Sequence, residues 1–355
     1  MSLGLQTGAA PKPRIVIADD SALMRRILQR ALEDAGLEVV GTAADGDEAL
    51  AQCAALNPDA MTLDLHMPGK DGIAVLRALQ APGAPKVPAV VVSAFSPAHG
   101  ARAVDALAEG AFELVAKPGV GTPLTTFAAE LCQKLRLAAR VPDAVAPRAA
   151  ATLSPPPRRA PSAAAPVRGG RLVVIACSTG GPKALAELIP QLPARLGAGV
   201  LIVQHMPPGF TASLAARLDR ASALTVAEAA GGETLEPGVA LLAPGGSHLR
   251  LASERAVALS DEPAVGNLRP RADLTIVDAA RLWGPRLLLV VLTGMGKDGL
   301  EGAEAVRRQG GRVLVEAEET CTVYGMPRAV AEADLADDIL PLNKLAAAIA
   351  AEANP

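Results

Sequence analysis

Short apolar runs rich in Val, Ile and Leu recur along this sequence, and each leads through a polar turn into a helical pattern. The run at residues 14–18 is followed by Asp-Asp-Ser and by an amphipathic segment that ends at Gly36. The run at residues 172–176 is followed by Cys-Ser-Thr-Gly-Gly-Pro and by a periodic segment at residues 183–189. Continuous apolar runs are typical of strands buried on both faces of a sheet. Their alternation with helices predicts an α/β fold with doubly wound parallel sheets.

The pattern occurs in two blocks, and the segment between them differs in composition. With 355 residues, half of them hydrophobic, the chain is long enough to bury two cores. Pro and Ala dominate the stretch before Gly170, which has no apolar periodicity and cannot bury enough surface to fold. We predict a first domain at residues 12–137, a flexible linker at residues 138–170 and a second domain at residues 171–354.

The apolar runs also predict the individual elements. In the first domain, we expect strands at residues 14–18, 39–42, 60–63, 87–92 and 111–116, with helices at residues 22–36, 47–55 and 123–137. In the second domain, we expect strands at residues 172–176, 200–203, 286–292 and 312–316, with helices at residues 183–189, 211–220, 272–282, 300–309 and after Pro341. Shorter strands between residues 239 and 260 suggest a β-rich edge.

Charge and cysteine content exclude several classes of protein. A net charge of −3 with 2% aromatic residues offers neither the basic surface nor the stacking platform of a nucleic-acid-binding protein. The four cysteines are far apart and form no C-x-x-C, so we expect neither disulfides nor a zinc site. The first residues do not resemble a signal peptide, and no apolar run reaches the roughly 18 residues of a membrane helix. We expect a cytoplasmic monomer with no membrane insertion and no nucleic-acid partner.

Five chemically distinctive residues follow the strands predicted for the first domain. They are Asp19, Asp20, Asp64, Ser93 and Lys117. Carboxyl ends of parallel strands meet at one edge of the sheet, so these side chains should lie close together. Three adjacent carboxylates repel unless a cation joins them, and oxygen ligands favour Mg²⁺. A metal beside a carboxylate would also offset the charge of an incoming phosphoryl group.

The first domain contains four distinctive motifs, which are ADDSALMRR, LDLHMPGKDG, VVSAFS and AKPG. Together they resemble the motifs of a two-component response-regulator receiver domain. The resemblance implies a flavodoxin-like fold in which Asp64 accepts phosphate from a chemotaxis histidine kinase. It also implies that Asp19 and Asp20 hold Mg²⁺ together with Asp64, and that Ser93 and Lys117 form the receiver switch. Receivers often carry Tyr or Phe three residues before this lysine, where the chain has Leu114.

Ser178, His205 and Asp298 follow strands predicted for the second domain. An imidazole can remove the proton of a serine hydroxyl, and a carboxylate on the far ring nitrogen orients the imidazole. Ser178 alone could instead cap the following helix. Cys177 is an alternative nucleophile, although its side chain should point away from that of Ser178, and His248 is an alternative base. The glycines after Ser178 are expected to leave room for a substrate backbone.

The motifs ACSTGGP, VQHMPPGF, LLAPGGSH, LTGMGKDG and VYGMPRAV resemble those of the chemotaxis receptor methylesterase family. The resemblance implies a Rossmann-like catalytic domain in which Ser178 is the nucleophile, His205 the general base and Asp298 the orienting acid. Thr179 would line the site, and backbone amides near His205 and Met295 would form the oxyanion hole.

The same resemblance implies the substrate and its control. The substrate would be a glutamate γ-methyl ester of a methyl-accepting chemoreceptor, and some members deamidate receptor glutamines as well. No cofactor is expected in the esterase site, and the unphosphorylated receiver would cover it. Two positions depart from the family pattern: Cys177 stands where Ala or Ser is common, and Arg271 replaces the serine of an Arg-Pro-Ser-x-Asp segment.

Three other functions remain open from the sequence. The second domain could be a non-catalytic adaptor, with the receiver acting as a phosphate sink. The chain could be a DNA-binding response regulator, although it lacks a helix-turn-helix pattern and a basic patch. It could also hydrolyse small molecules. Methanol release from methylated receptors distinguishes the methylesterase from all three.

Overall fold

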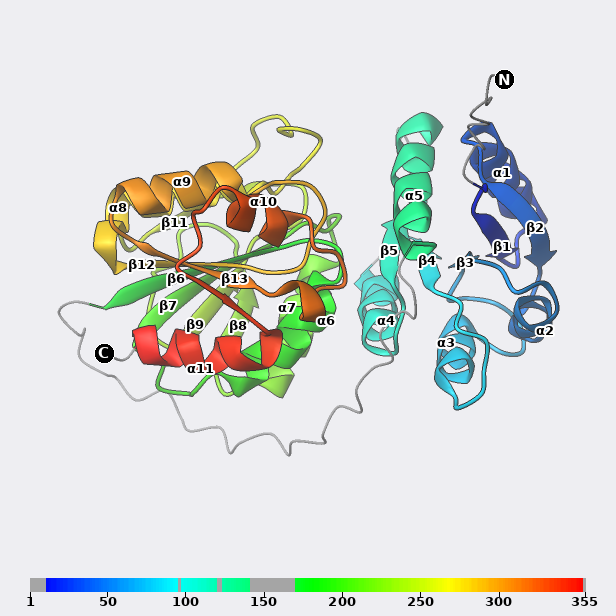
Figure 1. The fold of residues 1–355 in the computed structure, drawn as a ribbon, viewed down its shortest axis with the longest axis horizontal. Coiled ribbons are helices and arrows are strands. Elements are labelled where there is room, and N and C mark those ends of the chain that lie inside the picture. The colour runs from blue at the N-terminus through cyan, green and yellow to red at the C-terminus, as the bar shows by residue number, and fades with distance from the viewer. Residues whose placement is uncertain (1–10, 95–96, 120–122, 141–169, 354–355) are drawn as a thin grey trace, which may run out of the picture. The chain divides into compact units, whose positions relative to one another are not determined.

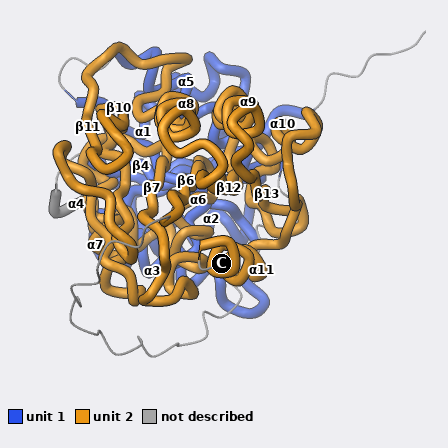
Figure 2. Tube along the Cα trace, turned by 90° about the vertical axis from the view of Figure 1, so that its left-hand side faces the viewer, with its two compact units in different colours: residues 1–94, 109–147 blue, residues 95–108, 148–355 orange. Residues whose placement is uncertain are grey.

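A computed structural model describes residues 11–94, 97–119, 123–140 and 170–353 of the chain (Figure 1). The described residues fall into two compact units, one within residues 1–94 and 109–147 and the other within residues 95–108 and 148–355 (Figure 2). The proposed linker lies at residues 138–170, and residues 141–169 are outside the described part of the chain. The predicted domain boundaries stay a prediction.

The first unit contains a five-stranded parallel sheet in the order β2-β1-β3-β4-β5. Its strands are β1 (Arg14–Ala18), β2 (Glu38–Ala43), β3 (Ala60–Leu63), β4 (Ala89–Ser93) and β5 (Glu113–Ala116). Its helices are α1 (Ala22–Asp34), α2 (Gly46–Leu56), α3 (Gly72–Gln80) and α5 (Leu124–Ala138). Ser21 caps α1 through a hydrogen bond from the N–H of Met24 to its hydroxyl, at 3.3 Å. The five predicted strands are confirmed to within two residues at each end.

The second unit contains a seven-stranded sheet in the order β14-β13-β12-β6-β7-β9-β8, and all its strand pairs are parallel. Its strands are β6 (Arg171–Cys177), β7 (Ala198–Gln204), β8 (Thr225–Glu228), β9 (Val239–Leu242), β12 (Leu287–Val291), β13 (Arg312–Glu316) and β14 (Asp338–Leu340). A separate antiparallel hairpin joins β10 (His248–Leu251) to β11 (Val257–Ser260). The predicted fold class, α/β with two doubly wound parallel sheets, is confirmed.

Helices cover both faces of this second sheet. They are α6 (Gly181–Leu188), α7 (Thr211–Ala221), α8 (Ala272–Trp283), α9 (Leu300–Arg308), α10 (Met326–Glu332) and α11 (Leu342–Ala353). In Figure 1, α8, α9 and α10 lie on one face of the sheet, and α6, α7 and α11 lie on the other. The unit also includes α4 (Pro97–Ala108) and single 3₁₀ turns at Ile189–Gln191, Gly284–Arg286 and Glu318–Thr320. The central strands β6, β7 and β12 are almost wholly buried, which explains their continuous apolar sequences.

Each sheet has a point at which the winding reverses. In the first sheet β1 lies between β2 and β3, and in the second β6 lies between β12 and β7. Connections that leave such a point on opposite faces open a crevice at the carboxyl ends of the strands, where α/β proteins bind ligands. We therefore expect ligand-binding or catalytic side chains in the segments that directly follow β1, β3, β6, β7 and β12. No helix in the described residues is long and apolar enough to cross a membrane.

Candidate active site and acidic cluster

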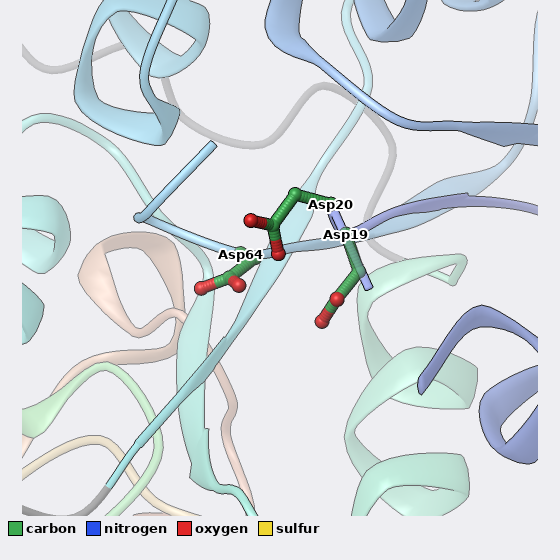
Figure 3. A group of neighbouring side chains, drawn as sticks. All are labelled: Asp19, Asp20 and Asp64. Carbon is green, nitrogen blue, oxygen red and sulfur yellow. The ribbon is translucent and has the colours of Figure 1, made fainter. Parts of the chain in front are cut away.

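Three aspartates meet at the carboxyl ends of β1 and β3 (Figure 3). One carboxylate oxygen from each of Asp19, Asp20 and Asp64 lies within 4.8 Å of the others. Asp19 and Asp64 are buried, whereas Asp20 is exposed, so the cluster has one open side. Oδ2 of Asp19 is buried and lies within ion-pair distance of the Lys117 ammonium group. An all-oxygen donor set that is open on one side fits a hard cation such as Mg²⁺.

Lys117 follows β5 and lies against the same cluster. Its Nζ is 2.8 Å from Oδ2 of Asp19 and donates a hydrogen bond of 2.7 Å to Oδ2 of Asp64. Burial alone would lower the pKa of Lys117, but its hydrogen bonds to the two aspartates raise it above the usual value. Burial raises the pKa of Asp19 despite the opposing effect of Lys117. The predicted Asp19, Asp20, Asp64 and Lys117 are thus brought together.

Ser93 and Leu114 lie on the neighbouring strands β4 and β5. Ser93 ends β4 at the same edge of the sheet, is fully buried, and its Oγ has no hydrogen-bond partner among the described residues. Leu114 is buried within β5. The side chain three residues before Lys117 is therefore part of the apolar core of this unit.

Ser178 lies where β6 turns toward α6, and backbone and side-chain bonds hold it from both neighbouring strands. Its N–H donates to the carbonyl O of Thr293, after β12, at 3.0 Å. Its own carbonyl O accepts from Nε2 of Gln204, the last residue of β7, at 3.0 Å. The N-cap of α6 is Gly180, and no side chain caps this helix, so the alternative role of Ser178 as a helix cap is wrong. The hydroxyl is free to serve another purpose.

His205 and Asp298 form a short hydrogen bond beside Ser178. Cys177 pairs with Gln204 in the register of β6 and β7, so the next residues, Ser178 and His205, follow the ends of neighbouring strands. Nε2 of His205 lies 2.6 Å from Oδ2 of Asp298. The other ring nitrogen, Nδ1, is left for a different partner. The three residues predicted as a catalytic triad thus lie at the ends of β6, β7 and β12, on either side of the winding reversal.

Asp298 is buried and held by backbone amides. Its carboxylate accepts from the N–H groups of Ala272 and Asp273 at 2.7 and 2.9 Å. Burial would raise the pKa of Asp298, but the hydrogen bond and charge of His205 and the contacts with Asp273 hold it below the usual value. Asp298 is therefore ionised at neutral pH and favours the His205 tautomer that carries its proton on Nε2.

Two alternative residues are unsuited to catalysis. The Cys177 thiol is fully buried, and burial followed by the nearby charge of Glu316 raises its pKa far above the usual value. His248 is also fully buried. Its Nδ1 accepts from the N–H of Arg271 at 3.2 Å, and its Nε2 lies 3.3 Å from the carbonyl O of Pro263. Both ring nitrogens therefore serve to hold a loop.

The glycines after Ser178 make room for the protein's own side chains. A Cβ at Gly180, where φ is +79°, would lie 2.4 Å from Thr322. A Cβ at Gly181 would lie 1.9 Å from Oε1 of Gln204. The Cβ direction at each of the two glycines is thus filled by a side chain of the protein, and the expectation that these glycines also leave room for a substrate backbone stays a prediction.

Comparisons with known proteins match each of the two units to a protein family. Residues 173–349 match the family model of the CheB methylesterase, and residues 15–126 match that of the response regulator receiver domain. A protein-glutamate methylesterase/protein-glutamine glutaminase of Symbiobacterium thermophilum is 43% identical over 348 residues, covering 95% of this chain and 96% of that protein. The chain belongs to the protein-glutamate methylesterase family.

Other members of the methylesterase family give the same result. A protein-glutamate methylesterase/protein-glutamine glutaminase of Myxococcus xanthus is 44% identical over 347 residues, covering 94% of this chain and 96% of that protein. Among solved structures, the CheB methylesterase catalytic domain of Thermotoga maritima aligns with a TM-score of 0.50 and 45% identity. That alignment covers 51% of this chain and 98% of the solved domain.

The sequence did not predict several residues that hold the backbone around Ser178 and His205. Thr293 accepts the N–H of Ser178, and its own N–H donates to Oε2 of Glu316 at 2.8 Å. Nε2 of Gln204 bonds the carbonyl oxygens of both Ser178 and His205, at 3.0 and 2.9 Å. Each of these residues ends or follows a strand, which was the available signal. Thr293 and Gln204 are uncharged, and the residues directly before and after Glu316 are not acidic, so none of the three could be selected as a site residue.

Thr179 and Met295 were predicted to line the methylesterase site. Thr179 is buried in the turn after Ser178, and its carbonyl O accepts from Oγ1 of Thr293 at 2.9 Å. Met295 is partly exposed in the loop between β12 and Asp298. Both residues belong to the segments that carry the triad, and their contact with a substrate stays a prediction.

Proposed function

We propose that this chain is a serine hydrolase that removes methyl groups from glutamate γ-methyl esters of chemoreceptors and deamidates receptor glutamines, which gives sensory adaptation in chemotaxis. The single observation that carries the proposal is the short hydrogen bond between His205 and Asp298, with Ser178 following the strand next to the one that His205 follows. The names of the family relatives support the choice of substrate.

Ser178 is proposed to act as the nucleophile. Its Oγ attacks the ester carbonyl while Nδ1 of His205 takes the hydroxyl proton, which passes to the leaving oxygen so that methanol departs. Water then attacks the acyl-enzyme, again giving a proton to His205, and the proton returns to Ser178 as the glutamate is released. With a glutamine substrate, the leaving group is ammonia. Asp298 holds the imidazole through Nε2 and stabilises its charged form.

The oxyanion of each tetrahedral intermediate needs aligned hydrogen-bond donors. We assign this role to the backbone N–H groups beside His205 and at Met295, with Thr179 lining the site. Within the described residues, the N–H groups of Met206 and Met295 donate to no other residue, which supports the assignment.

We further propose that phosphorylation of Asp64 by a chemotaxis histidine kinase controls the esterase. Asp19, Asp20 and Asp64 would hold Mg²⁺, which offsets negative charge on the phosphoryl group when bound. Lys117 would contact the phosphoryl group, and Ser93 would couple phosphorylation to release of inhibition by the receiver. The enzyme would act in the cytoplasm, because the methylated helices of chemoreceptors lie there. It would act as a monomer.

Methanol release from methylated receptors tests the proposal. The full chain should release methanol faster after addition of a small phosphodonor and Mg²⁺, and Ser178→Ala should release none. Asp64→Asn should keep the basal rate of methanol release, and the phosphodonor should not increase that rate. This variant is therefore the matched control for regulation. Methanol release by Ser178→Ala would refute the triad, and stimulation of Asp64→Asn would refute the assigned phosphorylation site.

A further inference from the structure

The side chain of Arg271, at the start of α8, contacts two buried carboxylates. Its Nη2 donates to Oδ2 of Asp273 at 2.7 Å, and its Nε lies 3.5 Å from Oδ1 of Asp298. Its Nη1 donates to the carbonyl O of Val265 at 3.4 Å. The side chain is only 19% exposed, so its charge is directed toward the triad carboxylate and away from solvent.

Asp298 and Asp273 are fixed side by side because each binds the first N–H groups of the other's helix. Asp298, which precedes α9, accepts from the first N–H groups of α8, at Ala272 and Asp273. Asp273, in the first turn of α8, accepts from the N–H groups of Gly299 and Gly302 at the start of α9, both at 2.8 Å. Unpaired N–H groups at helix N-termini favour a carboxylate, so neither side chain can leave without cost.

Two buried carboxylates held together repel one another when both are ionised. Burial, followed by the charge of Asp298, raises the pKa of Asp273. Asp298 keeps a low pKa because its bond to His205 outweighs its burial. A cation in contact with both groups reduces the repulsion, and Arg271 is placed to do so.

We propose that Arg271 is a positioning residue: by contacting Asp273 and Asp298 together, it prevents the second carboxylate from displacing Asp298 from His205. The inference rests on the proposed esterase function, because it assigns a task within that triad. Arg271 does not touch the reacting atoms and acts only through Asp298.

Several charged or titratable groups reach this cluster from the elements packed around it. They are His205 after β7, His248 on β10, Arg271 and Asp273 of α8, Asp298 before α9 and Glu301 in the first turn of α9. Removal of Arg271 takes away the cation that favours the ionised form of Asp273. The pKa of Asp273 should then rise further, and a second negative charge beside Asp298 should appear only as the pH passes through that value.

The test is the pH dependence of methanol release by the full chain. Arg271→Gln should remain active where Asp273 is protonated and lose activity at alkaline pH, with kcat falling about tenfold or more and KM changing about twofold or less. Wild type should show no such alkaline loss. The double variant Arg271→Gln/Asp273→Asn has no second carboxylate and should regain the alkaline rate.

Two matched variants separate position from charge. Arg271→Lys keeps a cation and should show no alkaline loss. Arg269→Gln makes the same charge change two residues away, where the side chain donates only to the backbone carbonyls of Asp261 and Glu262. It should keep the wild-type profile.

A second readout does not depend on catalysis. The imidazole N–H proton that His205 donates to Asp298 should be observable by NMR in wild type at all these pH values, and should be lost at alkaline pH in Arg271→Gln. A wild-type profile for Arg271→Gln, or alkaline loss that persists in the double variant, would overturn the inference. If wild type released no methanol but the NMR result held, the proposed function would fail while the positioning role stood.

Discussion

Replacing Gly181 with alanine separates two explanations for the glycines behind Ser178. In the structure, a Cβ at Gly181 would lie 1.9 Å from Oε1 and 3.0 Å from Cδ of Gln204, and 3.0 Å from Cβ of Cys177. Gln204 is 1% exposed, so its side chain cannot avoid the clash simply by staying in solvent. Its amide must therefore move, and it is this amide that bonds the carbonyl oxygens of Ser178 and His205.

The expected cost follows from these contacts. Overpacking a dense core costs about 1–3 kcal/mol. Each of the two lost hydrogen bonds adds about 0.5–1.5 kcal/mol, and the better helix propensity of alanine returns about 1 kcal/mol or less. We expect Gly181→Ala to lower the free energy of unfolding by roughly 1–6 kcal/mol. Displacement of the two carbonyls should also lower kcat by about a hundredfold, since a small misplacement of reacting groups is costly.

Urea unfolding and methanol release provide the assay, and Gln204→Ala provides the matched partner. The shorter side chain removes the clash, so Gly181→Ala should cost much less in a Gln204→Ala background, with a coupling energy of about 1–3 kcal/mol. An increase in KM at unchanged stability would refute this reasoning. It would mean that Gly181 makes room for the substrate instead.

Four further predictions test other parts of the molecule. Asp298→Ala should lower kcat by about a thousandfold or more with little change in KM, because His205 loses the acceptor of its Nε2–H. The folded-state pKa of Asp298 lies below its usual value, so its ionisation stabilises the fold above about pH 4 and this stability is lost as the pH falls. Wild type should therefore lose stability faster than Asp298→Ala in acid, as followed by circular dichroism. Iodoacetamide at neutral pH should leave esterase activity intact, because burial raises the pKa of the Cys177 thiol. A serine-directed phosphonate should abolish the activity. Inactivation by iodoacetamide would instead favour Cys177 as the nucleophile. Lys117→Met should destabilise the first unit by about 3–5 kcal/mol in EDTA, because Asp19 and Asp64 lose the cation between them. Addition of Mg²⁺ should restore part of this stability. A free energy of unfolding that does not depend on Mg²⁺ would contradict the prediction.

The sequence predicted those elements whose sequences reflect burial. The strands β1, β3 and β13 have the predicted bounds, because each is a run of apolar residues enclosed on both faces. The elements α3, α4, β8, β14 and α10 were not predicted. The edge strands β8 and β14 are three or four residues long and largely open to solvent, so their sequences carry little apolar pattern. α10 has only seven residues and begins with Met-Pro, too short for a helical period to emerge.

The candidate site likewise contains some residues that the sequence predicted and others that it could not predict. Ser178, His205 and Asp298 could be selected because a nucleophile, a base and an acid each followed a predicted strand. Asp273 could not, because an acidic residue in the first turn of a helix is ordinary near the helix dipole. Its contact with Asp298 arises only when the starts of α8 and α9 meet, which is a tertiary event. Arg271 was recognised as a departure from the family pattern, but its inward direction could not be predicted.

The position of Ser178 depends on the neighbouring strands as well as on the turn that contains it. Its N–H bonds the carbonyl of Thr293, whose N–H in turn bonds Glu316 on β13. Its carbonyl bonds Gln204 on the other side. Ser178, the proposed nucleophile, is thus held from both neighbouring strands. Substitutions at Thr293, Glu316 or Gln204 should therefore lower kcat and leave KM nearly unchanged, whereas substitutions of residues that bind the receptor should raise KM.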